Sequence, residues 1–362
     1  MHKRRLKKSV KLSLFIILFL FLFSICFFFF KLSGFNKDEV IEYEVKKGSS
    51  IYNVLVDLDK NNIIRDSLFS KIYVKLFNIS GFQAGTYDLN RSYSSIKIIN
   101  MLRDGDVNKK DEVNITFKEG KSIVNLVKLI VDNTNNTEED VYNLLKDKEY
   151  IDSLISKYWF LEDVVKNKDI RYALEGYLFP DTYTILKTSS VNFIFTKMLD
   201  RMNQIITPYK DEIEQSNYSI HEILTMASIV ELEGKFDDDR AMISGVLFKR
   251  LENYWTLGSD VTSYYAAELD MSENPIIFKS ALELASPYNT SSLNKGYNML
   301  GKLPIGPICS PGKASILATL NPVESDYWFF IADCRTMTTI FNKTNAMHDK
   351  SVAEIKASGC KF

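Results

Sequence analysis

Three histidines and four cysteines in 362 residues leave little material for a metal site. The histidines, His2, His221 and His348, are scattered along the chain, and no two cysteines form a CxxC pair. Zinc sites need such ligands at short and regular spacings, so the pattern argues against one. The scattered histidines do not indicate a catalytic triad either. We therefore expect no metal.

The sequence also lacks an excess of charge of one sign. Its 45 Lys and Arg residues nearly balance 46 Asp and Glu residues, so no overall field favours nucleic acid as a partner. With 46% apolar and 13% aromatic residues, a chain of this length can bury a substantial core. We expect two or three soluble modules.

The cysteines give no clear disulfide framework. Cys26 lies in an apolar run, which leaves Cys309, Cys334 and Cys360 for the rest of the chain. This odd number predicts no obligatory set of disulfides, although a bridge between Cys309 and Cys334 remains an alternative.

The amino end has the pattern of a membrane anchor. Residues 1–11 carry six Lys or Arg and no acid, and residues 12–30 run for 19 positions without a charge. At about 1.5 Å per residue, such a helix can cross a hydrocarbon core of about 30 Å. We predict a cytoplasmic tail at 1–11, a transmembrane helix at 12–30 and an extracytoplasmic remainder. A cleaved signal peptide and a lipoprotein signal at Cys26 are the alternatives, but the four phenylalanines after Cys26 favour an uncleaved span.

An accessory α+β region is predicted at 41–133. A glycine turn and a serine-capped helix occur at Lys46–Val54 and again at Lys118–Leu126. An alternating strand leads into each of them, at Ile41–Lys47 and at Val113–Phe117. Chance similarity between two common turn signals is the alternative. A further strand at Gly85–Leu89 and a helix at Ser94–Arg103 complete this region.

The remainder, 137–362, is predicted to be a mainly helical α+β domain. Thr137 has the features of a helix cap, and a terminal hairpin and a last helix from about Asn345 close the chain. The predicted helices and hairpin strands are Val191–Ile206, Ser219–Glu233, Asp237–Glu252, Lys313–Leu320, Tyr327–Ala332 and Thr338–Asn342.

Six strings in this domain combine polar residues with Gly, Pro and aromatics in a way that packing alone does not require. They are Leu174–Tyr183, Met226–Lys235, Leu257–Thr262, Ser286–Thr290, Lys302–Gly312, and Phe329–Asp333 with Phe341–Asn342. Aromatic faces beside carboxylates suit sugar rings. In the second string, Glu231 and Glu233 end an apolar helix, where partial burial would raise a carboxyl pKa and keep a proton available for a leaving oxygen. Taken singly, each string also fits an ordinary helix end or turn.

In this order the strings resemble the MltG (YceG-like) family of endolytic peptidoglycan transglycosylases over nearly the whole chain. The family order is an EG string with aromatics and PDT, then ASIVE-x-E, an Arg seven residues later, LQ-[ST]-DPT, PYNT and GLPPGPI-x-NPG. Arg240 stands at the Arg position, and His348 and Ser351 fall in the closing HNKS-like string. The membrane span, a LysM-like opening module and Ala84–Tyr87 resemble the family too. The departures are Gly258 for Gln, Val261 and Ile305 for Pro, Lys302 for Gly and Ser310 for Asn.

The resemblance implies cleavage of the β-1,4 bond between N-acetylmuramic acid and N-acetylglucosamine in nascent strands. The product would carry a 1,6-anhydro end, and strand elongation would stop there. One Glu serves as acid and then base, because the sugar's own C6 hydroxyl is the nucleophile. No cofactor is implied. The expected partners are peptidoglycan strands and the membrane, with peptidoglycan synthases or division proteins as candidate protein partners.

The choice between the two glutamates depends on the resemblance. Residues two apart on a helix point about 200° from each other, and each of these borders the apolar face. The family match favours Glu231 as the catalytic acid, and Glu233 would then be free to pair with Arg240. The substrate-binding residues expected around Glu231 are Glu175, Asp181, Glu233, Arg240, Ser259, Asp260, Tyr288, Asn289 and Thr290.

Two other functions stay open. A hydrolytic muramidase would use Glu175 or Asp260 as a second carboxylate. A non-catalytic wall-binding or division scaffold would use the LysM-like module alone, although intact Glu231, Asp260 and Asn289 argue against a degenerate cleft.

Overall fold

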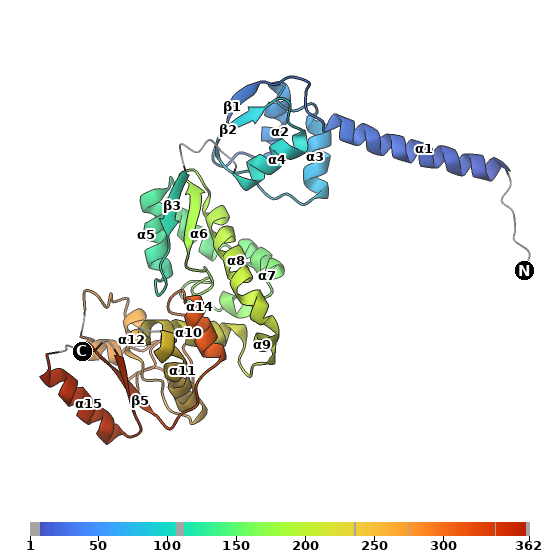
Figure 1. Cartoon of the computed structure of the whole chain (residues 1–362). Coiled ribbons are helices and arrows are strands. Elements are labelled where there is room, and N and C mark those ends of the chain that lie inside the picture. Colours follow the sequence, from blue (N-terminus) through green and yellow to red (C-terminus); the bar gives the residue numbers. More distant parts are fainter. Residues whose placement is uncertain (1–7, 106–111, 235–236, 275, 337, 360–362) are drawn as a thin grey trace, which may run out of the picture. The chain divides into compact units, whose positions relative to one another are not determined.

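The computed structural model describes residues 8–105, 112–234, 237–274, 276–336 and 338–359 (Figure 1). Residues 1–7 of the expected cytoplasmic tail lie outside this range. The chain mixes helices with small two-stranded sheets, in agreement with the predicted α+β class. It packs as two compact units. Unit 1 holds the described residues up to Val113 together with Ile185–Phe193, and unit 2 holds Asn114–Thr184 and the residues from Ile194 onward.

Unit 1 is built around one antiparallel pair of strands. Its elements are α1 (Lys8–Lys31), β1 (Val40–Val45), α2 (Ile51–Lys60), α3 (Ser67–Leu76), β2 (Gly85–Asn90) and α4 (Ser95–Asp104). In the sheet, Val40 lies opposite Asn90 and Val45 opposite Gly85. The order is therefore strand, two helices, strand and a closing helix.

Apolar residues at helical spacing explain the core of unit 1. Helix α2 buries Leu55 and Leu58, and α4 buries Ile98 and Leu102. Their spacing of three or four residues places each pair on one helix face. Tyr87, on β2, is fully buried among them.

Helix α1 is apolar along most of its length. Its side chains from Phe15 to Phe30 are mostly exposed, whereas the following Leu32 is buried in unit 1. Lys31 pairs with Asp66 at 3.0 Å. Within the described ranges, no helix combines the length and the hydropathy that a membrane crossing requires.

The repeated strand, glycine turn and helix is confirmed as local structure. Gly48 precedes α2 and Gly120 precedes α5 (Ile123–Asn133), with φ of 79° and 72° in the left-handed region that favours glycine. The caps differ. Ser50 makes no side-chain cap bond, whereas Ser122 donates through its backbone N to Asn125 Oδ1 at 3.1 Å.

Most of the remaining elements belong to unit 2. They are β3 (Glu112–Thr116), α6 (Glu138–Lys146), α7 (Lys148–Lys157), the 3-10 helix η2 (Asp163–Lys166), β4 (Thr182–Leu186), α8 (Val191–Ile206), the 3-10 helix η3 (Thr207–Tyr209), α9 (Lys210–Gln215), α10 (Ile220–Glu233), α11 (Asp237–Glu252), α12 (Asp260–Ala266), α13 (Lys279–Leu282), α14 (Lys313–Leu320), β5 (Phe329–Asp333), β6 (Thr338–Asn342) and α15 (Asn345–Ala357). Strand β3 pairs with β4, and β5 pairs antiparallel with β6. The predicted helices and terminal hairpin are confirmed within a few residues.

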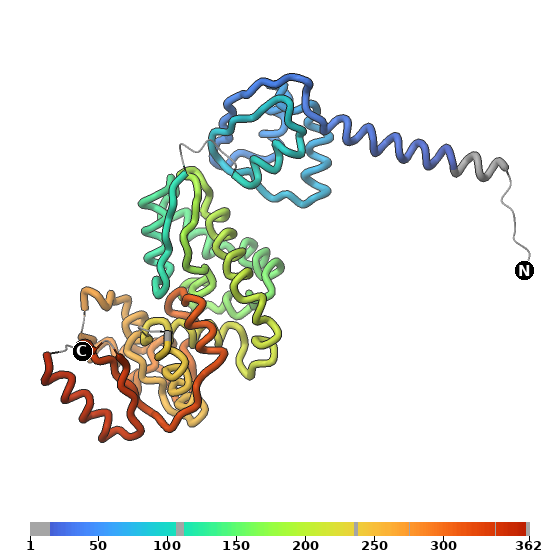
Figure 2. Tube along the Cα trace, in the orientation of Figure 1, coloured from blue at the N-terminus to red at the C-terminus, as the bar shows by residue number. Residues whose placement is uncertain are grey.

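Helices α10, α11 and α14 pack together at the centre of unit 2 (Figures 1 and 2). Met226, Ile229 and Val230 of α10 meet Ile243 and Leu247 of α11 in one buried cluster. Helix α15 packs on the β5–β6 hairpin. This arrangement fixes the carboxyl end of α10, which carries both glutamates of the acidic string.

Candidate active site

Helix α10 is buried on almost every side. From Ile220 to Val230, only Glu222 is exposed. Glu222 closes a capping box with Ser219, whose backbone N donates to the Glu222 carboxylate at 2.8 Å. A helix that is apolar all round belongs in a core, and the carboxyl end of α10 is where its acidic pair lies. That end carries Glu231 and Glu233.

Both carboxylate oxygens of Glu231 are occupied from within the protein. Oε2 accepts from the backbone N of Gly312 at 3.0 Å and from Ser315 Oγ at 2.7 Å. Oε1 accepts from Arg240 Nη2 at 3.3 Å. Gly312 and Ser315 lie at the amino end of α14, where unpaired backbone N–H groups and the helix dipole favour a negative charge. The Glu231 side chain is only 7% exposed. Its hydrogen bonds join α10 to Arg240 of α11 and to the amino end of α14.

Arg240 therefore pairs with Glu231 rather than with Glu233, which corrects the pairing expected from sequence. Its Nε also donates to the carbonyl of Gly234 at 3.2 Å. A Cβ on Gly234 would lie 2.6 Å from Arg240 Cγ, so a side chain there would displace the arginine. The glycine that ends α10 is thus required for the Arg240–Glu231 ion pair.

Glu233 has a different environment. Ser259 Oγ donates to its Oε1, and Asp260 and Arg250 are the charges that act on it. Burial raises the pKa of Glu233 above its ordinary value, and the negative charge of Asp260 raises it further, while the Ser259 hydrogen bond opposes the shift. Arg250 also opposes it. The net effect is a pKa of Glu233 above its ordinary value.

Glu233 also lines a cavity of about 370 Å³. The cavity lies between the end of α10, the start of α12, the β5–β6 hairpin and α15. Its lining residues are Glu233, Arg250, Gly258, Asp260, Phe330, Ile331, Ala332, Thr339, His348, Val352 and Lys356. Glu231 is not among them. A carboxyl group with a raised pKa beside a polar and aromatic cavity is an arrangement that suits general acid catalysis.

Asp260 opens α12 at the edge of this cavity. Its side chain is exposed, yet neighbouring protein atoms remove part of its hydration and raise the pKa of Asp260. Two carboxyl groups with raised pKa values, Glu233 and Asp260, therefore face the same cavity.

Asn289 and Thr290 are fully buried, and Thr290 holds the loop that carries Ser259. Thr290 Oγ1 accepts from the backbone N of Ser259 at 3.2 Å, and the carbonyl of Thr290 accepts from Gly258 N at 3.1 Å. Asn289 Nδ2 donates to the carbonyls of Leu282 and Leu284 at 2.8 and 2.9 Å. These residues shape the wall of the cavity and do not line it.

Glu175, expected in the cleft, is enclosed elsewhere in unit 2. Its carboxyl accepts from the backbone N of Ile123 at 3.0 Å and from Tyr265 Oη at 3.1 Å. Burial raises the pKa of Glu175 to about 8. It satisfies the amino end of α5, and it does not line the Glu233 cavity.

Two more expected residues lie apart from the cavity. Tyr288 is buried, its Oη accepts from Arg171 N at 3.0 Å, and burial raises the pKa of Tyr288 to about 12. Asp181 accepts from Arg201 Nε at 2.8 Å beside strand β4. Of the ten expected site residues, Glu233 and Asp260 line the cavity, Ser259 bonds to Glu233, and the others support the surrounding fold.

Sequence reasoning assigned no role to two residues of the cavity. Arg250 is held by the carbonyls of Trp328 and Leu257 and lies over the Phe329 and Phe330 rings. The only sequence feature that pointed to His348 was its position in the closing HNKS-like string. No sequence motif marks Arg250, because its partners come from distant segments.

The alternative of a disulfide between Cys309 and Cys334 is wrong. Cys309 is a buried free thiol that donates to the carbonyl of Ser228 at 3.3 Å, so it forms no bridge with Cys334. Cys360 lies outside the described residues. Across the described part of the chain, no cluster of three or more metal-ligating side chains occurs.

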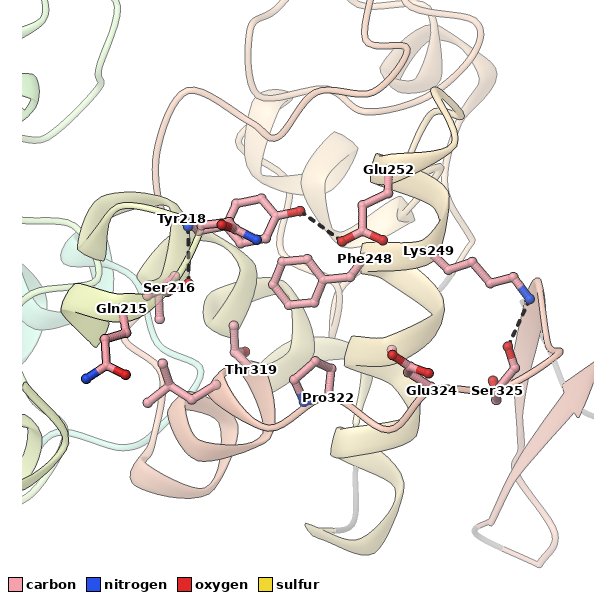
Figure 3. Close-up of a pocket in the computed structure, with 14 residues that line it drawn as sticks. Gln215, Ser216, Tyr218, Phe248, Lys249, Glu252, Thr319, Pro322, Glu324 and Ser325 are labelled. Carbon is pink, nitrogen blue, oxygen red and sulfur yellow. Dashed lines mark hydrogen bonds between the residues drawn. The ribbon is translucent and has the colours of Figure 1, made fainter. Parts of the chain in front are cut away.

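A larger cavity of about 510 Å³ lies elsewhere in unit 2 (Figure 3). Tyr218, Phe248 and Pro322 contribute to its wall, and Tyr218 Oη donates to Glu252 at 3.4 Å. None of the expected site residues lines it. The charged groups near its wall form ordinary hydrogen bonds, such as that from Lys249 to the Ser325 carbonyl at 2.9 Å.

Comparison with known proteins gives a consistent result. The model of the YceG-like family matches residues 43–354. A Bacillus subtilis protein named endolytic murein transglycosylase is 34% identical over 315 residues, which cover 86% of this chain and 83% of that protein. A protein of the same name from Streptococcus pneumoniae is 28% identical over 334 residues. The match covers 88% of this chain and 59% of the streptococcal protein. A solved structure of a yceG-like protein from Listeria monocytogenes has a TM-score of 0.61 and 32% identity, and the match covers 87% of this chain and 100% of that one.

Proposed function

Because the chain belongs to the YceG-like family, we propose that it is an endolytic murein transglycosylase that cuts peptidoglycan glycan strands between N-acetylmuramic acid and N-acetylglucosamine. The name shared by the Bacillus and Streptococcus relatives supports the substrate class. The observation that carries the proposal is the position of Glu233, which lines the 370 Å³ cavity beside Asp260 and accepts a hydrogen bond from Ser259. Burial there raises the pKa of Glu233.

In the proposed reaction Glu233, and not Glu231, is the proton donor. This reverses the sequence-based assignment on geometric grounds. Glu231 is engaged by Arg240, Gly312 N and Ser315 and is nearly enclosed, whereas Glu233 lines the cavity and has a raised pKa. Glu231 is then a positioning residue, because it joins α10 to α11 and α14.

The chemistry requires one carboxyl group. Glu233 would protonate the glycosidic oxygen as the C1–O bond breaks, and its carboxylate would then accept the proton of the C6 hydroxyl as that oxygen attacks C1. The C6 hydroxyl belongs to the same sugar, so proximity replaces an activated water. The product is a 1,6-anhydro ring and a new free 4-hydroxyl. Arg250, on the same cavity wall, would stabilise Glu233 once it has lost its proton.

Asp260 makes hydrolysis the second candidate. It lines the cavity together with Glu233, so it could activate water or form a covalent intermediate as in two-carboxylate glycosidases. Product mass separates the two reactions. We expect residues 32–362, incubated with uncrosslinked glycan strands and chelator, to release fragments with anhydro ends. Reducing ends with oxygen from labelled water would instead establish a muramidase.

The amino-terminal part supports two further proposals. The order β1, α2, α3, β2 with its antiparallel strand pair fits a LysM-like wall-binding module at the start of the 41–133 region. We also propose that α1 anchors the protein in the cytoplasmic membrane, because its basic flank precedes 19 uncharged residues. Under this proposal the domain 137–362 is extracytoplasmic, so a phosphatase fused at residue 362 is active. An inactive fusion would refute this topology.

A further inference from the structure

His348 occupies the Glu233 cavity without a partner for one of its ring nitrogens. It lies on α15, which covers the hairpin, and its ring stacks on Phe329 with centroids 5.3 Å apart. Nδ1 is buried, and no hydrogen-bond partner for it exists among the residues that the structure describes. A buried polar atom without a partner is costly, and because the His348 ring lines the cavity, a group bound there can supply a partner.

The surroundings of His348 favour the neutral imidazole. Burial lowers the pKa of His348, and the nearby positive charge of Arg250 lowers it further, while Asp349 opposes the shift. Glu233, Asp260 and Lys356 are the other ionisable groups of this cavity. A neutral imidazole presents one donor and one acceptor, so it suits an uncharged polar group better than an ion.

The wall beside His348 is apolar. Phe330, Ile331 and Ala332 of β5 and Val352 of α15 line the cavity together with the imidazole. An acetamido group matches this combination, because its methyl can contact the aliphatic side chains while its amide exchanges a hydrogen bond with the ring. Both sugars of the proposed substrate carry one.

We propose that His348 is a substrate-binding residue that recognises the 2-acetamido group of a sugar bound beside Glu233. This inference rests on the proposed function for its substrate class. It assigns the hydrogen bond to the ring nitrogens of His348 and the methyl contact to Ile331, Ala332 and Val352. It predicts that the protein discriminates against strands without N-acetyl groups, and that His348 is a source of that discrimination.

The test pairs a ring variant with a substrate series. His348→Phe keeps a ring against Phe329 and removes both nitrogens. It is compared with the parent on fully N-acetylated strands, on chemically N-deacetylated strands and on the same strands after re-acetylation. The parent should lose about tenfold or more in kcat/KM on deacetylated strands and recover after re-acetylation. For His348→Phe, the ratio of kcat/KM on acetylated strands to kcat/KM on deacetylated strands should be about fivefold smaller than for the parent. This is the effect expected for the loss of one neutral hydrogen bond.

Two further variants exclude a purely structural effect. Met347→Phe changes an exposed neighbour on α15 that does not line the cavity, and it should keep the parental ratio. His348→Asn, whose amide can replace Nδ1, should keep more discrimination than His348→Phe and serves in its place if the ring variant does not fold. Equal losses by the His348 variants on acetylated and deacetylated strands would overturn the inference.

A binding assay separates this inference from the proposed reaction. In the Glu233→Gln background, the affinity for acetylated and deacetylated strands is measured without turnover. His348→Phe in that background should again reduce the ratio of affinities about fivefold. Preserved discrimination would refute the role of His348 even if cleavage is confirmed. Absence of cleavage by the parent, with discrimination in binding, would refute only the proposed reaction.

Discussion

Ser259 donates a hydrogen bond to Glu233 across 26 positions of sequence, and this contact links the loop before α12 to the end of α10. The donor stabilises the Glu233 carboxylate, whereas burial and the charge of Asp260 favour the protonated form. Ser259 itself is held by Thr290 from the buried side of the loop. Burial is thus the main cause of the raised pKa of Glu233, and the adjacent residues Ser259 and Asp260 adjust it in opposite directions.

Replacing Ser259 by Ala should move the pH profile to higher pH. The variant loses the donor to the carboxylate, so the pKa of Glu233 rises and the acid keeps its proton further into the alkaline range. The alkaline limb of kcat/KM, which reports the free enzyme, should shift upward by about half a unit or more.

Asp260→Asn is the matched opposite change. It removes a negative charge that raises the pKa of Glu233, so the alkaline limb should move downward. Shifts in the same direction for both variants, or no shift in either, would mean that another group governs the limb.

Glu175 makes the stability of unit 2 depend on pH. Its pKa in the folded protein is raised from 4.5 to about 8, so the folded state binds the proton more tightly than the unfolded state. The stabilisation is fully present below the unfolded value and is lost as pH rises through about 8. Glu175→Gln keeps an acceptor for Ile123 N and does not titrate. Its denaturation midpoint should fall less than the parental one between about pH 5 and about pH 8. An equal fall in both proteins would contradict this account.

Gly176 is required for two separable reasons. Its φ of 81° is left-handed, and an added Cβ would lie 2.3 Å from Pro307 Cβ. Gly48 has a similar φ of 79° with no heavy atom within 4 Å of the same position. Gly48→Ala should therefore cost only the conformational strain of about 1 kcal/mol, and Gly176→Ala about 3 kcal/mol or more. Equal losses in the free energy of unfolding would show that Pro307 moves away freely.

Regular elements of this fold could be predicted from sequence because their signals are local. Helices α8, α11 and α14 begin and end at the predicted residues, and the repeated glycine turns recur at Gly48 and Gly120. Short helices such as α12 were not predicted, because seven residues carry little periodicity.

The site itself depends on contacts between distant segments, which local patterns do not contain. Glu231 and Glu233 both border an apolar face, and their partners, Ser315 and Ser259, come from other segments. The sequence allowed Arg240 to pair with Glu233, but Arg240 pairs with Glu231. Burial of Glu175 and Asn289 likewise follows only from tertiary packing.

Glutamine replacement of each carboxylate of α10 separates their roles. Glu231→Gln breaks the buried ion pair between Glu231 and Arg240, so it should lower the free energy of unfolding by about 3 kcal/mol. Below its lowered melting temperature, the folded fraction should keep measurable turnover. Glu233→Gln removes the transferable proton while Ser259 can still donate to the amide oxygen, so it should bind strands and stay folded.

The most direct measurement is the rate at which anhydro ends appear on defined glycan strands for these two variants, normalised to folded protein. We predict that Glu233→Gln falls at least about a thousandfold, within the range for loss of a general acid. We predict that Glu231→Gln stays within about tenfold of the parent. Near-parental turnover by Glu233→Gln, together with a dead but folded Glu231→Gln, would contradict the account and return the acid to Glu231.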